Sequence, residues 1–297
     1  MKAIIKELVD IVVIPIFEKV SFLRKIATYV SKRLSNDGYH YLKKKFIKNG
    51  IKSKWNENVR KKIVERFEAI DRGMPIASTP TDGLFLAEAL LSTEAEGSVI
   101  ECGCFSGGST TKLSIVAKIL NKRLYVFDSF EGLPIVDQYN LKDYHLKRNS
   151  EEWGNWTAGR YASKLDNTKY NVEKYGEISV CTFHKGWFNN TLNEENLPDK
   201  ICFAFTDVDI PSSARECLIA IWPKLTDGSI YFTHDVAYIK VLQALLDGNL
   251  WREAIKEFPP ILFGSGSGLC DSSPHLGFFI KGNAISAEYI NSLTIDK

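Results

Sequence analysis

The stretch VIECGCFSGGSTTKLSIV, residues 99–116, decides the fold of this chain. Its first residues are apolar and end in Glu101, as at the end of a buried strand. Glycines follow in a turn, and Ser109 or Thr110 can then cap a helix. Glycine lets a ligand approach the backbone closely and permits the positive φ that such a turn requires. Because a helix N-terminus favours negative charge, the unit predicts a site for a nucleotide-like ligand.

Apolar, strand-like runs alternate with helical segments from residue 98 onward. The expected strands are SVIEC (98–102), RLYVFD (123–128), EISVCTFH (177–184), KICFAFTD (200–207) and GSIYFTHD (228–235), and the expected helices cover residues 109–120, 160–175, 211–223 and 236–247. This alternation predicts a parallel α/β sheet with helices on both faces. The runs 259–263 and 275–281 read as an antiparallel hairpin, so we expect a mostly parallel, seven-stranded sheet.

The first 73 residues differ from the rest in charge. They carry 18 Lys and Arg against 8 Asp and Glu, whereas the remaining residues carry 20 against 28. We expect a basic, helical extension over residues 1–73 and a second domain over residues 74–297, with a joint rich in helix breakers at residues 72–83 and Thr81 capping the next helix. The positive charge leaves open a membrane surface, an anionic substrate, an acidic partner or a solvated helical face.

Composition narrows the class of protein. Of the 297 residues, 44% are hydrophobic and 12% aromatic, which is ample for a packed core. The apolar run at residues 11–17 is too short to span a membrane and lacks the features of a signal peptide, although an N-terminal amphipathic helix could contact a membrane surface. The six scattered cysteines fit a reducing cytoplasm. The chain has no basic stretch interleaved with aromatic residues, which is the pattern that would indicate nucleic-acid binding. We expect a cytoplasmic protein that forms a homo-oligomer.

Charged or titratable residues follow each of the five expected parallel strands. They are Glu101, Asp128, His184 with Lys185, Asp207 with Asp209, and His234 with Asp235. Ligands of open α/β sheets bind beyond the carboxyl ends of the strands, so these residues predict the rim of an active site.

Two ligands compete for the glycine turn. A dinucleotide site has the pattern G-x-G-x-x-G and an acidic residue about 20 positions further on, and Asp128 lies at that distance from Gly108. A carboxylate that accepts from ribose hydroxyls suits either ligand. The glycines here give G-x-x-x-G-G instead, preceded by Glu101, which is a pattern of S-adenosylmethionine sites. We therefore favour S-adenosylmethionine over a dinucleotide, and both over a purely structural turn.

Four segments together carry a family resemblance. ECGCFSGGST (101–110), FDSFEGLP (127–134), HKGWFNNTL (184–192) and TDVDIPSSARECLIAIWPKLTDGSIYFTHD (206–235) occur in this order. Over residues 75–281 the chain resembles the macrocin and mycinamicin type of sugar O-methyltransferase. The resemblance implies a Rossmann-like class I methyltransferase fold. It also implies methylation of a hydroxyl on a sugar or a glycosylated small molecule, either a natural product or a polysaccharide.

The resemblance also implies site residues. The cosubstrate S-adenosylmethionine matches Glu101, Gly103, Gly107 and Ser109 of the turn, Asp128 for the ribose hydroxyls, and Ser129 beside the adenine.

A magnesium site of the family matches Asp207, Asp235 and a third position, which is His234 in this chain. Because Mg²⁺ prefers oxygen ligands, the histidine leaves open a Mg²⁺ site, a Mn²⁺ site or no metal. Asp209, two residues after Asp207, could supply a further oxygen.

The general base is open among four residues, Asp207, Asp209, His234 and His145. His145 lies in the polar segment 135–159, which is long enough to form a lid or an acceptor-binding loop and includes Trp153 and Trp156. Two other functions remain as alternatives, namely a nicotinamide-dependent oxidoreductase and an S-adenosylmethionine-binding protein that has lost turnover.

Overall fold

The structure is a computed structural model that describes residues 37–135 and 158–282. A first helical segment covers residues 37–48. The helices are η2 (Asn49–Lys52), α4 (Glu57–Gly73), α5 (Pro80–Ser92), α6 (Gly108–Ile119), α8 (Leu165–Tyr175), η3 (Ile178–Val180), α9 (Phe188–Thr191), α10 (Pro211–Ile221), η4 (Trp222–Lys224), α11 (Ile239–Leu245) and η5 (Leu250–Ile255). The strands are β1 (Ser98–Cys102), β2 (Leu124–Asp128), β3 (Cys181–Lys185), β4 (Ile201–Thr206), β5 (Leu225–Thr233) and β6 (Gly277–Ile280).

The strands form one sheet in the order β3-β2-β1-β4-β5-β6. The five strands β1 to β5 are parallel to their neighbours, and β6 runs antiparallel to β5. The predicted α/β fold with an antiparallel strand at its C-terminal end is confirmed. The strand order reverses between β1 and β4, which is where such sheets bind ligands.

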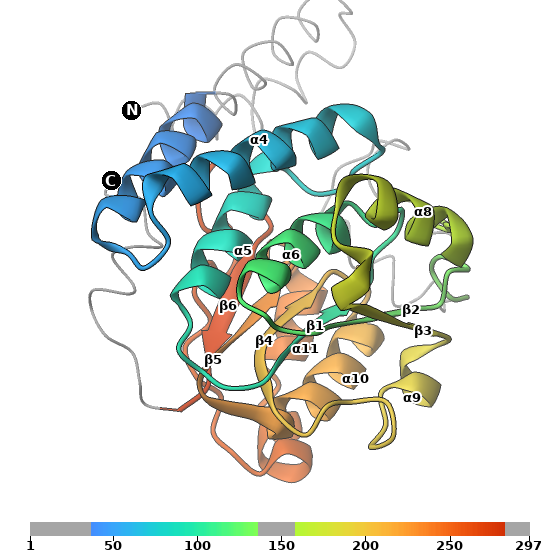
Figure 1. The fold of residues 1–297 in the computed structure, drawn as a ribbon. Coiled ribbons are helices and arrows are strands. Elements are labelled where there is room, and N and C mark those ends of the chain that lie inside the picture. The colour runs from blue at the N-terminus through green and yellow to red at the C-terminus, as the bar shows by residue number, and fades with distance from the viewer. Residues whose placement is uncertain (1–36, 136–157, 283–297) are drawn as a thin grey trace, which may run out of the picture.

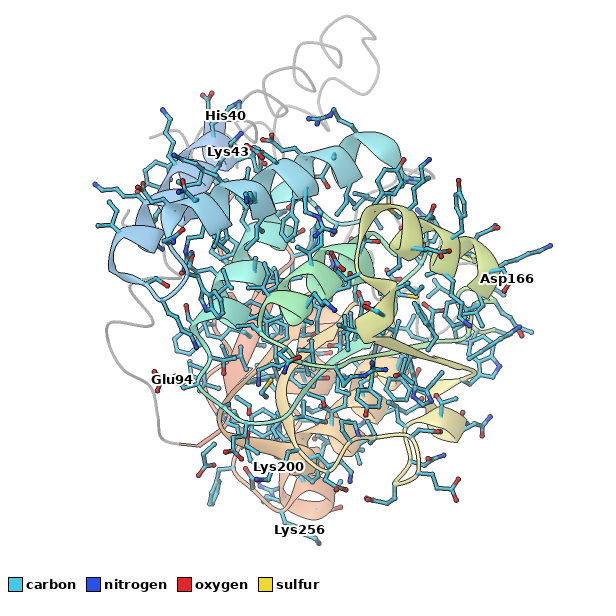
Figure 2. The ribbon with its side chains drawn as sticks, viewed as in Figure 1. His40, Lys43, Glu94, Asp166, Lys200 and Lys256 are labelled. Atoms are coloured by element: carbon cyan, nitrogen blue, oxygen red, sulfur yellow. The ribbon has the colours of Figure 1, made fainter. Side chains whose placement is uncertain are left out.

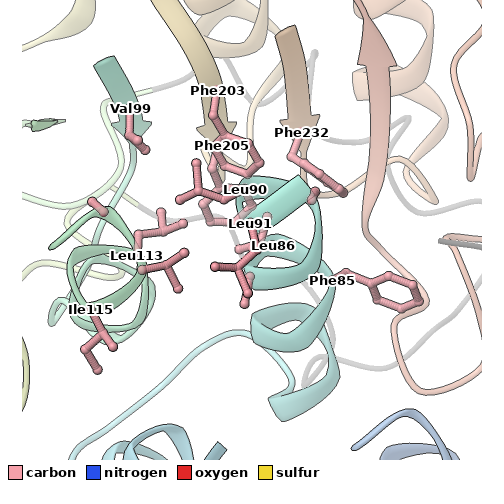
Figure 3. Close-up of a cluster of buried hydrophobic side chains, with 14 of the residues drawn as sticks. Phe85, Leu86, Leu90, Leu91, Val99, Leu113, Ile115, Phe203, Phe205 and Phe232 are labelled. Carbon is pink, nitrogen blue, oxygen red and sulfur yellow. The ribbon is translucent and has the colours of Figure 1, made fainter. Parts of the chain in front are cut away.

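Helices cover both faces of the sheet (Figure 1), with α4, α5 and α6 on one side and α10 and α11 on the other. Neighbouring strand residues alternate between the two buried clusters, since Val99 and Phe232 pack with the first and Ile100 and Tyr231 with the second. Figure 3 shows the first cluster, in which α5 and α6 side chains meet Phe203, Phe205 and Phe232.

The sheet of the described residues has six strands, not the predicted seven. Only Phe263 of the run 259–263 pairs with the sheet, through an isolated bridge to Phe278 at the free edge of β6. Pro259 and Pro260 lack the N–H that a ladder needs, so the chain cannot form a regular strand before Phe263. The expected hairpin is thus reduced to one closely spaced pair of hydrogen bonds.

The described part of the basic N-terminal segment is helical and packs on the sheet domain. Ile63, Phe67 and Ile70 of α4 lie in the same buried cluster as α5 and α6. Arg60 is buried and pairs with Glu88 of α5 while donating to the carbonyl of Phe46. This network fixes α5, whose first turn reaches the functional site.

Charged side chains cover the outside, and Glu94, Asp166 and Lys200 point to solvent at the periphery (Figure 2). Within the described ranges, no helix is both long enough and apolar enough to cross a bilayer. Residues 1–36, on which the predicted membrane contact rests, lie outside the described residues, as do His145, Trp153 and Trp156.

Candidate functional site

A pocket of about 430 Å³ lies at the carboxyl ends of β1, β2, β4 and β5. The predicted site residues in its wall are Gly103, Ser109, Asp128, Ser129, Asp207, Asp209, His234 and Asp235. Glu101 and Gly107 belong to the same strand–turn–helix unit but are not part of the wall. The structure therefore brings the glycine turn and the acidic strand ends, which are about 100 residues apart in sequence, into one pocket.

The glycine turn is built for close packing against β4. Gly103 has φ +82°, and a Cβ there would lie 1.9 Å from the carbonyl oxygen of Asp207. Gly107, with φ +89°, is the N-cap of α6, and a Cβ there would lie 3.0 Å from Thr168 of α8. Gly103 therefore joins the two halves of the pocket, whereas Gly107 lets α6 begin under α8.

The expectation that Ser109 or Thr110 caps α6 is wrong. The helix begins at Gly108 without a side-chain cap, because its N-cap is Gly107, which has no side chain. Ser109 is thus a helical residue of the first turn and lines the pocket.

Asp128 closes β2 with a carboxylate held by backbone amides. Its Oδ2 accepts from the N–H groups of Cys104 (2.7 Å) and Phe105 (3.3 Å), and its Oδ1 accepts from the N–H of Phe130 (2.7 Å). The hydroxyl of the next residue, Ser129, donates to the carbonyl of Gly132. A carboxylate has about four lone-pair sites, so Asp128 retains acceptor capacity at Oδ1 while its position is fixed.

Glu101 is fully buried, and neither of its carboxylate oxygens has a hydrogen-bond partner among the described residues. Burial raises the pKa of Glu101 to about 8; the charges of Asp128 and Asp207 add to the increase, while the nearby hydroxyls of Ser109 and Thr110 oppose it. The side chain is therefore largely a neutral acid near pH 7, and a cation brought into the pocket favours its ionisation.

Three predicted residues form a compact cluster at the ends of β4 and β5. The His234 Nδ1 lies 3.0 Å from Asp235 Oδ1 and 3.3 Å from Asp207 Oδ1. Burial raises the pKa of Asp207 to about 6, although the charge of His234 opposes this. Burial lowers the pKa of His234, but Asp207 and Asp235 outweigh it and hold this pKa well above its usual value.

Sequence reasoning missed Asp82, which faces His234 from the other side. Its Oδ2 lies 3.8 Å from His234 Nε2 and accepts from the N–H of Thr79 (2.6 Å), while its Oδ1 accepts from the hydroxyl of Ser273. Burial raises the pKa of Asp82, but His234, Ser273 and Thr79 together lower it below the usual value.

The signal for Asp82 was present as T-x-x-D, the capping-box pattern of Thr79 and Asp82. The structure therefore corrects the expected cap at Thr81, because the N-cap is Thr79, two residues earlier, and α5 begins at Pro80.

The cluster suits a divalent cation by the chemistry of its donors. One oxygen or nitrogen from each of Asp207, His234 and Asp235 lies within 4.8 Å of the others, and the buried Asp235 Oδ2 has no hydrogen-bond partner among the described residues. Two carboxylates and an imidazole are ligands of Mn²⁺ and related dications.

Strained backbone gathers around the pocket. Among the described non-glycine residues, seven have positive φ, and four of them, Phe105, Tyr161, Asp209 and Asp235, line the pocket wall. Such conformations cost of order 1–3 kcal/mol each and persist where the surroundings enforce them, often at functional sites. Asp209, with φ +60°, therefore lines the pocket at a conformational cost.

Aromatic side chains form the wall beside the acidic cluster. The Tyr238 and His275 rings stack at 5.1 Å, and the rings of Phe105 and Tyr161 meet edge to face at 5.7 Å. The Arg160 guanidinium lies 4.9 Å from the centre of the Tyr161 ring. This wall offers flat apolar faces with polar atoms at their edges.

A family model described as macrocin-O-methyltransferase (TylF) matches residues 85–257, more than half of the chain. The chain belongs to this macrocin O-methyltransferase family. The match spans the glycine turn, Asp128 and the acidic cluster, and it ends short of Asp82 and His275 on either side. The chain is therefore an S-adenosylmethionine-dependent O-methyltransferase.

Solved structures share the fold of this family member. The O-methyltransferase NovP covers 84% of this chain and 100% of its own at 15% identity, with a TM-score of 0.53. The calicheamicin methyltransferase CalS11 covers 75% of this chain and 93% of its own at 18% identity, with a TM-score of 0.49. A search of curated proteins gave no match. The NovP alignment confirms the predicted methyltransferase fold.

Proposed function

We propose that this enzyme transfers the methyl group of S-adenosylmethionine to a hydroxyl of a sugar or of a glycosylated small molecule, a natural product or a polysaccharide. The observation that carries the proposal is that one pocket contains both the glycine turn with Asp128 and the acidic strand ends. The family name supports an oxygen acceptor on a glycoside.

The cosubstrate would lie along the ends of β1 and β2. Asp128 would accept from a ribose hydroxyl at Oδ1, and Ser129 would adjoin the adenine. Ser109, in the first turn of α6, would face the methionine half, where a helix N-terminus favours the carboxylate. Gly103 and Gly107 would shape the turn, and Glu101 beneath it would ionise in response to the cationic ligand.

The remaining chemistry is to hold the acceptor and remove its proton, because the sulfonium of the cosubstrate already activates the methyl group. We favour Asp209 as the base over Asp207 and His234, because it lines the pocket on backbone with φ +60° and is not one of the three residues of the candidate metal cluster. Asp207, His234 and Asp235 would hold a divalent cation, either Mg²⁺ or Mn²⁺, which would lower the pKa of the acceptor hydroxyl.

Calorimetry and a transfer assay test this proposal. We expect the full chain to bind S-adenosylmethionine but not NAD(H), and to transfer labelled methyl groups to members of a panel of glycosides. Asp209→Asn should lower kcat about 10²- to 10⁴-fold and leave the affinity for S-adenosylmethionine unchanged. Binding without transfer to any glycoside would instead support a protein that has lost turnover, and preferential binding of NAD(H) would contradict the proposal.

A further inference from the structure

His234 is the residue at which this chain departs from the acidic pattern of its family resemblance, and three carboxylates surround its ring. Asp207 follows β4, Asp235 follows β5, and Asp82 lies in the first turn of α5. Two of them, Asp235 and Asp207, lie 3.0 and 3.3 Å from Nδ1, whereas Asp82 lies 3.8 Å from Nε2 on the opposite side. The two ring nitrogens therefore have different partners.

The spacing on the Nδ1 side suits ligands of a shared ion. Two donors at right angles, each about 2.1 Å from a metal, lie about 3 Å apart. The separations from Nδ1 to Asp235 and to Asp207 are close to this value, and the shorter one is a hydrogen bond that a bound ion would replace. Asp235 is 4% exposed, and its second oxygen has no hydrogen-bond partner among the described residues. A buried carboxylate oxygen without a donor indicates that a cation belongs beside it.

A nitrogen in the donor set changes which ion fits best. Mg²⁺ prefers oxygen ligands and gives up its waters reluctantly, whereas imidazole suits first-row transition-metal dications such as Fe²⁺ and Zn²⁺. Mn²⁺ is the hardest ion of that series and also takes carboxylates, but it accepts an imidazole ligand more readily than Mg²⁺ does. An aspartate at position 234 would supply a third charged oxygen, and His234 supplies a neutral nitrogen when it coordinates.

Asp82 is placed to fix the direction of that nitrogen. Its carboxylate is held by the Thr79 N–H and by the hydroxyl of Ser273, which is 191 residues away in sequence. Histidine ligands of metals commonly give their other ring N–H to a carboxylate, which sets the tautomer and the ring orientation. Asp82 lies on that side of the ring, 3.8 Å from Nε2, which is an ion-pair distance.

We propose that Asp207, His234 and Asp235 form a site that prefers Mn²⁺ and related transition-metal dications to Mg²⁺, with Asp82 as the positioning residue that directs His234 Nδ1 into it. On binding, the ion replaces any proton on Nδ1, which leaves to solvent. The role of the ion in catalysis rests on the proposed function. The binding of Mn²⁺ to the protein can nevertheless be measured without turnover.

Electron paramagnetic resonance of Mn²⁺ added to the chelator-treated full chain provides the test. We expect one Mn²⁺ per chain, an electron spin-echo modulation from a coordinated nitrogen, and displacement by Mg²⁺ only at a concentration at least about tenfold higher. His234→Asp should abolish the nitrogen modulation and reduce the preference for Mn²⁺ about tenfold. Both measurements are independent of whether any Asp82 variant folds.

Asp82→Asn should weaken Mn²⁺ binding about 10- to 100-fold, because it replaces the charged carboxylate that faces Nε2 with a neutral amide. Asp82 also belongs to the helix cap, so Thr79→Ala is the matched control: it removes the hydroxyl half of the same capping box and keeps the Asp82 carboxylate. We expect Thr79→Ala to lower the Tm and to leave the affinity for Mn²⁺ unchanged.

Several results would overturn the inference. They are absence of Mn²⁺ binding by protein that binds S-adenosylmethionine, equal affinity for Mn²⁺ and Mg²⁺, persistence of the nitrogen modulation in His234→Asp, and equal weakening by Asp82→Asn and Thr79→Ala. Binding of Mn²⁺ with the expected preference but without binding of S-adenosylmethionine would instead leave this inference standing and contradict the proposed function.

Discussion

The two halves of the pocket are assembled in different ways. On the side of β1 and β2, Asp128 contacts amides 23 and 24 residues earlier and one two residues later, so a single strand–turn–helix–strand unit contains these contacts. On the side of β4 and β5, the His234 cluster is completed by Asp82, which Ser273 holds across 191 residues. The first half is a local motif, and the second exists only when α5, the sheet and the segment before β6 have packed together.

The difference shows where the chain can change. The half of the pocket at β1 and β2, here called the cosubstrate half, uses backbone amides and glycines. Substitution of one of these glycines disturbs the geometry of the turn. The acidic half uses side chains from distant parts of the sequence, and in it His234 lies between Asp82 on one side and Asp207 and Asp235 on the other. The two halves touch where Gly103 packs against the Asp207 carbonyl.

The largest effect is expected from Gly103→Ala, which adds a methyl group at this contact. The new Cβ would lie 1.9 Å from the Asp207 carbonyl oxygen on backbone with φ +82°. We expect the free energy of unfolding, measured in urea, to fall by at least about 3 kcal/mol. Gly228→Ala is the matched control, because Gly228 has φ +79° but no atom within 4 Å of an added Cβ. It should cost only about 1–2 kcal/mol, and equal losses would show that the junction is not tight.

The next-largest effect is expected from Asp128→Ala, which tests whether the two halves of the pocket bind their ligands independently. Asp128→Ala should weaken S-adenosylmethionine binding about 100-fold in calorimetry, since it removes a charged acceptor and frees the turn amides. Binding of Mn²⁺ should stay within about twofold of the parent. Asp166→Ala removes an equal charge from an exposed position on α8 and should change neither affinity (Figure 2). A parallel loss of both ligands in Asp128→Ala would mean that the two halves are not independent.

Glu101→Gln tests the buried acid of the cosubstrate half. The pKa of Glu101 is raised from 4.5 to about 8, so between these pH values the unfolded chain ionises this group while the folded protein keeps it protonated. The free energy of unfolding therefore falls as the pH rises, by at most about 1.4 kcal/mol per pH unit. Without ligand, the Tm of the variant relative to that of the parent should therefore increase as the pH is raised from 5 to 8. It should also bind S-adenosylmethionine about tenfold more weakly, because it cannot ionise. A Tm difference that does not change with pH would contradict the buried, neutral state.

The smallest effect is expected at the aromatic wall. Tyr238→Leu removes the ring that stacks on His275 at 5.1 Å. The KM for the glycoside acceptor should rise about three- to tenfold, because the lost contact is worth about 0.5–1.5 kcal/mol. The Kd for S-adenosylmethionine should not change. An effect on Kd alone would assign this wall to the cosubstrate.

The sequence determined the parallel sheet and four of the five strand ends at the pocket. The fifth was wrong, because His184 and Lys185 at the end of β3 do not line it. The hydrophobic pattern and the composition of a segment can be seen within a few residues. Parallel strands that are buried on both faces have polar residues mainly at their carboxyl ends. For this reason Asp128, Asp207 and His234 could be placed correctly from the sequence. The prediction of a seventh strand was wrong because Pro259 and Pro260 lack the backbone N–H donors that a strand needs, and an apolar pattern gives no information about those donors.

Only the tertiary structure decided what surrounds His234. Asp82 looks like an ordinary capping residue in the sequence, and its carboxylate meets the histidine because α5 packs over the ends of β4 and β5. The burial that leaves Glu101 without a partner is likewise a property of the packed core. Hydrophobic and turn patterns act over a few residues, whereas the charge state and direction of a buried group depend on neighbours that the chain brings together only on folding.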